Sequence, residues 1–162
     1  MIKTNKKMSF LLNEVNWKDK TLVVALDNIS NDSFVNVNGC IVMKSFHKLD
    51  TNVLCQDFPD KTGYECFINS LHIDDFAPND IVAQSLLFVK SVFIRWKQFS
   101  SYELLRAIVS IDEFDAVVKF HLVRDGENLL NDNLEGYEEA LLIVDSSWDT
   151  GVETLAHSKQ LT

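Results

Sequence analysis

The feature that most constrains the fold is a stripe of large apolar residues in the middle of the chain. Successive members lie three or four residues apart, so they share one face of an α-helix. The stripe consists of Val82, Leu86, Val89, Phe93 and Trp96. Pro78 and Asn79 precede it and are typical of a helix start. We predict a helix over 80–98, with a strand at 86–96 as the alternative because β-branched and aromatic residues are dense there.

Segments typical of β-strands flank this stripe on both sides. Asn38-Gly39 lies between two β-rich runs at 34–37 and 40–43, and this pair is the strongest short signal for a hairpin because both residues tolerate positive φ. The other predicted strands are at 21–26, 52–56, 64–73, 118–123 and 141–144. The first half of the chain is therefore expected to be mostly β.

Two local signals complete the expected secondary structure. Asp125-Gly126 predicts a second hairpin turn. Ser100 and Glu103 have the spacing of a capping box, which predicts a second, shorter helix after the central one. Strands around a central helical segment predict an α+β fold, mostly antiparallel sheet with one or two helices in the middle of the chain.

The length of the chain suits one domain. With 162 residues, of which 46% are hydrophobic, it can bury a core without metals or disulfides. The sequence shows neither an internal repeat nor a linker, and only five Gly and two Pro. We predict a flexible basic tail at 1–8, a single α+β domain at 9–150 and a C-terminal tail at 151–162.

The charge is distributed unevenly. Residues 1–110 carry 12 acidic and 12 basic residues, whereas 111–162 carry 12 acidic and three basic ones, which accounts for the whole net charge of −9. This acidic third disfavours nucleic acid and anionic membranes as partners, because both are negatively charged. It favours a basic protein partner, and the alternative is a solvated surface that only aids solubility.

The acidic third supplies the candidate partner-binding residues. Its carboxylates are expected in exposed turns, where they keep ordinary acidity and suit contacts with Lys or Arg better than catalysis. Tyr137 and Trp148 are the candidate aromatic anchors, whereas Trp17 and Trp96 are expected in the core. The candidate acidic contacts are Asp112, Glu113, Asp115, Asp132, Glu135, Glu138, Glu139 and Asp149.

The cysteines and the hydropathy pattern bear on the compartment. Cys40, Cys55 and Cys66 are odd in number and form no CxxC pair, which favours small buried thiols in a reducing cytosol over a disulfide framework or a zinc site. No apolar run has the length of a signal-peptide core or a membrane helix. We expect a cytoplasmic protein.

Motifs for catalysis or cofactor binding are missing from the sequence. It contains neither a nucleophile elbow nor a glycine-rich phosphate loop, so we expect no enzyme activity and no cofactor. The one candidate metal set is His72, Asp74 and Asp75, for which a strand end followed by an Asp turn is the favoured interpretation. His121 shows no positioned neighbour that would make it a general base.

Two segments of the acidic third carry a resemblance to a known family. They are Val117-Val118-Lys119-Phe120-His121-Leu122-Val123-Arg124-Asp125-Gly126-Glu127 and Leu134-Glu135-Gly136-Tyr137-Glu138-Glu139-Ala140-Leu141-Leu142-Ile143-Val144-Asp145. This region resembles the C-terminal part of bacterial immunity proteins that are encoded beside polymorphic toxins, including contact-dependent growth-inhibition systems. The resemblance implies a cytoplasmic, non-enzymatic inhibitor that binds one toxin domain, often a basic nuclease. It assigns no binding residue.

Three hypotheses for function follow. The first is an immunity protein that binds and neutralises a folded, basic toxin domain, which agrees with the charge distribution and the missing motifs. The second is an enzyme without a recognisable motif, with a metal at His72, Asp74 and Asp75. The third is an acidic secretion chaperone or adaptor.

Overall fold

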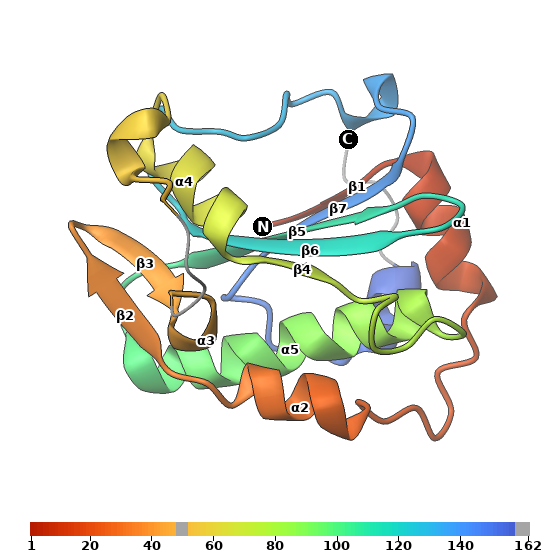
Figure 1. Cartoon of the computed structure of the whole chain (residues 1–162). Coiled ribbons are helices and arrows are strands. Elements are labelled where there is room, and N and C mark those ends of the chain that lie inside the picture. Colours follow the sequence, from red (N-terminus) through yellow and green to blue (C-terminus); the bar gives the residue numbers. More distant parts are fainter. Residues whose placement is uncertain (48–51, 158–162) are drawn as a thin grey trace.

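The centre of the fold is a five-stranded antiparallel sheet. The computed structural model describes residues 1–47 and 52–157. The strand order is β1-β7-β5-β6-β4, and Figure 1 shows helices on one face and a long loop with α4 on the other. The strands are β1 (Ile2–Thr4), β4 (Ser70–His72), β5 (Leu105–Ile111), β6 (Ala116–Leu122) and β7 (Ala140–Asp145). The predicted α+β class with a mostly antiparallel sheet is confirmed.

The predicted central helix is confirmed as α5 (Ile81–Phe99). Four of the five stripe residues are buried and Val82 is half-buried, so the stripe forms the face that packs on the sheet. The opposite side is covered in part by α2 (Val24–Ser30), which runs beside α5 in Figure 1. The Gln84 amide fastens this contact, since it accepts from the Val23 N–H and donates to the Thr21 carbonyl.

The predicted hairpin around Asn38-Gly39 is also confirmed. It joins β2 (Phe34–Val37) to β3 (Cys40–Met43) in a separate two-stranded sheet. Asn38 and Gly39 have φ values of 54° and 82°, the left-handed conformations that a two-residue type I′ turn requires.

Strand β7 lies between two apolar cores, and each of its faces contributes side chains to one of them. Leu142 and Val144 contribute to the large core under α5, and Leu141 and Ile143 contribute to a smaller one. The smaller core is closed by Leu134, within the loop that follows β6. Because both faces of the sheet are covered, β7 is buried along its whole length, as the apolar run at 141–144 predicted.

The prediction of a flexible tail at 1–8 is wrong. Residues 2–4 form β1, which pairs with β7, and α1 (Lys6–Glu14) begins directly afterwards. Asn5 is 1% exposed and fixes this junction. Its side-chain oxygen accepts from the N–H groups of Met8 and Leu141, and its amide donates to the Glu139 carbonyl. A sequence pattern cannot show the contacts with Leu141 and Glu139, because these residues lie more than 130 positions away.

The C-terminal tail predicted at 151–162 is partly structured. The 3-10 helix η3 (Val152–His157) places Leu155 in the large core with 3% of its surface exposed. The rest of that tail, 158–162, lies outside the described residues.

The strand predicted at 64–73 is wrong over most of its length. Residues 61–68 form α4 (Lys61–Ile68), which begins where the Asp60 carboxylate accepts from the Gly63 N–H, and only 70–72 is a strand. Glu65 is completely buried, and its carboxylate pairs with Arg124, which follows the end of β6. The helix places the Glu65 carboxylate beside its distant partner Arg124, and the local sequence pattern carries no sign of that ion pair.

Three further local predictions need correction. The segment at 21–26 is not a strand but leads into α2, and the segment at 52–56 leads into the 3-10 helix η1 (Cys55–Asp57). Ser100 and Glu103 do form hydrogen bonds in both directions, but no helix follows them because β5 begins at Leu105. The expectation that the first half is mostly β is therefore wrong.

The remaining local elements are short. The turn at Asp125-Gly126 exists, with φ of 79° at Gly126, but it joins only the bridged pair Arg124 and Glu127 and not two strands. The other short elements are α3 (Lys44–His47) and the 3-10 helix η2 (Leu134–Gly136). No helix in the described part of the chain is long and apolar enough to cross a membrane.

Candidate functional site

One end of the sheet gathers carboxylates from three separate segments. Ile111 pairs with both Ala116 and Ala140, and His72 pairs with Val117, so the β5–β6 turn, the start of β7 and the end of β4 all lie at this end. Figure 1 shows the β5–β6 turn beside α1. We name this surface the acidic edge, and it comprises Asp74, Asp112, Glu113, Asp115, Glu138 and Glu139.

The β5–β6 turn presents an aromatic ring to solvent. The Asp112 carboxylate accepts from the N–H groups of Phe114 and Asp115, both at 2.8 Å, and this bonding fixes the turn. Phe114 stands at its tip with 81% of its surface exposed, between Glu113 and Asp115. A large apolar side chain that this turn holds in solvent can serve as an anchor for a partner protein.

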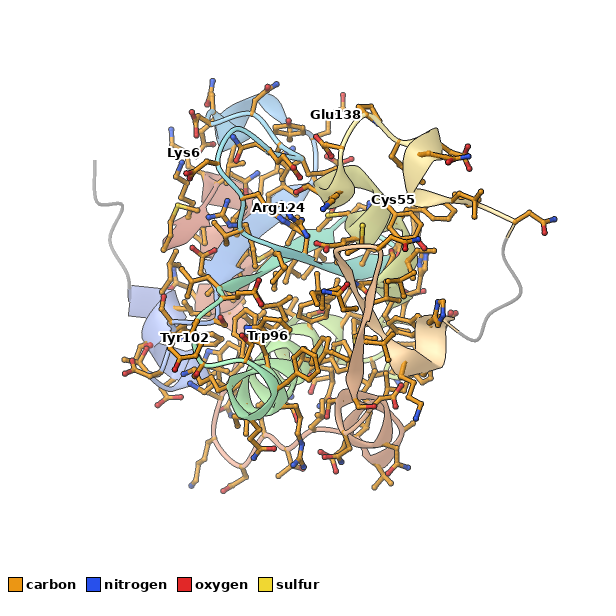
Figure 2. The ribbon with its side chains drawn as sticks, turned by 90° about the vertical axis from the view of Figure 1, so that its left-hand side faces the viewer. Lys6, Cys55, Trp96, Tyr102, Arg124 and Glu138 are labelled. Carbon is orange, nitrogen blue, oxygen red and sulfur yellow. The ribbon has the colours of Figure 1, made fainter. Side chains whose placement is uncertain are left out.

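A hollow of about 570 Å³ lies between this turn and α1. Its apolar lining comes from Phe10, Leu11, Ile111 and Ala140, and its charged lining from Lys6, Lys7, Asp112, Glu113 and Glu138. Figure 2 shows Lys6 and Glu138 in the upper part of the molecule. An apolar floor with a charged rim can receive an apolar side chain of a partner and pair with the charges around it.

The start of α1 closes one wall of this hollow. The Lys6 backbone N–H donates to the Glu135 carboxylate at 2.9 Å, and the Lys7 ammonium donates to the Glu138 carbonyl. Neither lysine pairs with the carboxylate of Glu138, so that charge stays free for a partner.

A second cluster at the acidic edge contains His72, Asp74 and Asp115. One nitrogen or oxygen from each lies within 4.8 Å of the others, and the His72 Nδ1 is 3.0 Å from an Asp115 oxygen. This cluster differs in one member from the candidate set His72, Asp74 and Asp75, because β4–β6 pairing brings in Asp115 and the cluster does not contain Asp75.

The two carboxyls of this cluster differ in acidity. A hydrogen bond from the Ala116 N–H lowers the pKa of Asp74. Burial, followed by a hydrogen bond with Asp74, raises the pKa of Asp115. This asymmetry suits the sharing of one proton, and the same three groups have the donor types that bind a divalent cation.

The remaining acids of the predicted set lie at the rim or away from the acidic edge. Asp132 pairs with Lys3 at 3.0 Å, and Glu135 binds α1 as described. Asp149 is exposed but follows the opposite end of β7, so it is not part of the acidic edge.

The two predicted aromatic anchors are engaged inside the protein. Trp148 is 5% exposed, belongs to the large core, and donates its indole N–H to the Thr150 hydroxyl. The Lys90 ammonium lies 4.6 Å from its ring centroid. Tyr137 is half-buried, packs on the smaller core and accepts from the Asn131 N–H. Sequence reasoning missed Phe114, the exposed aromatic residue of the acidic edge, and the available signal was a lone Phe inside an acidic turn.

The chain is a small α+β domain whose sheet ends in an acidic edge with an exposed aromatic residue at its tip. The chain belongs to the family described as "Uncharacterized protein PM0498 family", whose model matches residues 3–156. It is 34% identical over 140 residues to "Uncharacterized protein PM0498" of Pasteurella multocida (strain Pm70), an alignment that covers 80% of this chain and 88% of the relative. No solved structure matches the chain.

Proposed function

We propose that this chain is a cytoplasmic binding protein that neutralises a basic toxin domain, and that it binds this domain through the acidic edge. The observation that carries the proposal is Phe114, 81% exposed at the tip of a fixed turn and flanked by Glu113 and Asp115. The resemblance to immunity proteins supplies the kind of partner, and the charge distribution supports a basic one.

The free carboxylates of the acidic edge support a basic partner. Two other acids of the acidic third have partners within the protein: Asp145 forms an ion pair with Arg106, and Glu127 accepts a hydrogen bond from the Thr62 hydroxyl. By contrast, within residues 1–47 and 52–157 no Lys or Arg side chain forms an ion pair with Glu113, Glu138 or Glu139. Unpaired charges of one sign around an apolar anchor speed encounter with an oppositely charged surface.

The test uses the C-terminal domain of a toxin encoded beside this gene as the binding probe. Coexpression of the chain should rescue growth of cells that express the toxin domain. Surface-capture kinetics should show association that slows as salt rises, because salt screens exposed charges. Phe114→Ala should raise the dissociation rate about tenfold or more, as expected for an anchor residue.

A matched pair of charge reversals separates the acidic edge from general acidity. Glu113→Lys should slow association, whereas Asp125→Lys should not, although both replace an exposed acid in the acidic third. Asp125 follows the opposite end of β6, so it reports on net charge alone. Equal effects of the two reversals, or wild-type binding by the Phe114→Ala variant, would place the binding site elsewhere.

Two outcomes would contradict the immunity function itself. One is failure to rescue growth or to bind the toxin domain at any salt concentration. The other is binding to an unfolded segment of the toxin but not to its folded domain, which would support a chaperone or adaptor instead.

A second candidate function is a metal-dependent enzyme site at His72, Asp74 and Asp115, which the 4.8 Å grouping of their ligand atoms favours. Calorimetric titration of the wild-type chain with Zn²⁺ or Mn²⁺ tests it. Stoichiometric binding that is lost in Asp115→Asn but kept in Asp75→Asn would support this candidate, and heats equal to those of buffer would contradict it.

A further inference from the structure

Two of the three cysteines lie side by side although 15 residues separate them in the sequence. The Cys40 and Cys55 sulfurs are 3.1 Å apart. Cys40 is the first residue of β3 and Cys55 the first residue of η1, whereas Cys66 lies in the smaller core with Ile108 and Leu134. All three are free thiols here.

We propose that Cys40 and Cys55 are a reversible thiol-oxidation site that closes to an intramolecular disulfide when it meets a low-molecular-weight disulfide such as glutathione disulfide. The site goes beyond the proposed function and does not depend on it. Figure 1 shows β3 and the β5–β6 turn at opposite sides of the molecule, so the acidic edge is remote from this cysteine pair.

Local structure holds both sulfur atoms in place. Cys40 follows the fixed Asn38-Gly39 turn and pairs with Val37, and its side chain is completely buried. The η1 turn is closed by hydrogen bonds between Leu54 and Asp57. A disulfide bond is about 2.05 Å long, so the sulfurs need to approach by only about 1 Å from their present separation.

The turn that carries Cys55 is also fixed to α4. The Phe58 ring, which follows η1, contacts the rings of Tyr64 and Phe67 at centroid distances of 5.7 Å and 5.5 Å. Most of the ordering that a disulfide requires is therefore already present in the reduced protein.

The different exposures of the two thiols set the order of the reaction. Cys55 is partly exposed, so an external disulfide reaches its sulfur first. Burial, followed by the hydrogen bond with Cys55, raises the pKa of Cys40 to about 12, so in the reduced protein Cys40 is protonated and shielded from reagents in solution, and it reacts only after Cys55 has reacted.

The chemistry balances in two exchanges. The Cys55 sulfur attacks glutathione disulfide, forms a mixed disulfide and releases one glutathione. The Cys40 sulfur then attacks the Cys55 sulfur, forms the internal bond and releases the second glutathione. The two thiol protons go to the two departing thiolates, so the protein loses two electrons and glutathione disulfide gains them.

Mass spectrometry of the full chain tests the proposal. After reduction, desalting and incubation with glutathione disulfide, the native protein should lose two mass units and carry no glutathione. Peptide mapping without reductant should give one linked pair that contains Cys40 and Cys55. The melting temperature should rise by about 6–12 °C, as expected for closing a loop of this length in a chain of this size. Dithiothreitol should reverse all three changes.

Single cysteine variants identify the pair. Cys55→Ser should abolish the mass loss, and Cys66→Ser should leave it unchanged, which makes Cys66 the matched control. Cys40→Ser should retain one glutathione on Cys55. If this variant fails to fold, peptide mapping of the wild-type chain still shows which two cysteines are linked. Three thiols that remain reactive, a stable mixed disulfide on wild-type Cys55, or a linked peptide containing Cys66 would each overturn the proposal.

Discussion

Replacing Glu65 by glutamine tests whether the ion pair of this completely buried carboxylate with Arg124 holds the fold together. The Glu65 side chain is 0% exposed and that of Arg124 is 18% exposed. One carboxylate oxygen accepts from the Ile41 N–H at 2.6 Å and from the Arg124 guanidinium at 2.5 Å. The other accepts from the Leu122 N–H at 2.8 Å and from the same guanidinium at 2.9 Å. A single side chain thereby joins α4, β3 and β6.

The magnitude follows from counting acceptors. Glutamine has the same shape, but its amide nitrogen cannot accept, so one backbone N–H and one guanidinium N–H would face another donor. Each orphaned buried donor costs about 1–3 kcal/mol, and breaking a buried pair costs about 3–5 kcal/mol in all. We expect Glu65→Gln to lower the free energy of unfolding by about 3–5 kcal/mol and the melting temperature by roughly 6–20 °C.

Urea denaturation followed by circular dichroism measures this loss, and an unchanged m-value shows that the same structure unfolds. Glu113→Gln is the matched control, since Glu113 is exposed, and it should change stability by less than about 0.5 kcal/mol. Adding Arg124→Met to Glu65→Gln should recover part of the loss, because it removes the unpaired charge. A Glu65→Gln variant within about 1 kcal/mol of wild type would refute the reasoning.

Two further predictions concern buried polar groups. Asn5→Ala removes the side-chain oxygen that accepts from the N–H groups of Met8 and Leu141. It should lower the free energy of unfolding by about 2–4 kcal/mol. A loss below about 1 kcal/mol in urea denaturation would contradict the anchoring of the N-terminal segment. Burial lowers the pKa of His121, so the unfolded chain binds the proton more readily and stability should fall as pH drops below about 6.5, by up to about 1.4 kcal/mol per pH unit. Denaturation of wild type and His121→Gln across this range should show a shallower decline in the variant, and parallel curves would contradict the prediction.

Patterns with a local cause were predictable from the sequence. The stripe of α5 repeats at helical spacing because one face of that helix packs on the sheet, and Asn38-Gly39 suits only a few turn types. In β7 the apolar run reflects burial on both faces. In each case the residues that fix the element lie within the element itself.

Elements with a distant cause were not predictable. The order of residues over 64–68 suggests a strand, in which Tyr64, Cys66 and Ile68 would share one face. Glu65 is nevertheless completely buried, and its carboxylate pairs with an arginine 59 residues away. The only local signal against a strand was the Asp60 cap, which resembles an ordinary turn residue in sequence.

The candidate site shows the same division. The acidic third was visible in the sequence, and most of its predicted contacts are exposed in the structure. The role of Asp115 beside His72 depends on β4–β6 pairing across 43 residues, and the burial of Trp148 depends on how the chain after β7 returns to the large core. Neither follows from composition or spacing.

The position of β7 between β1 and β5 has a consequence for synthesis of the protein. On the ribosome, strands β5 and β6 can pair soon after they emerge, but the other edge of β5 stays open until residues 140–145 are available. The same strand is the partner of β1, so β1 has no partner in the sheet until residues 140–145 have been made. An open strand edge is a template for mispairing with other chains. Nascent chains stalled before residue 140 should therefore be the stage at which this protein most needs a chaperone.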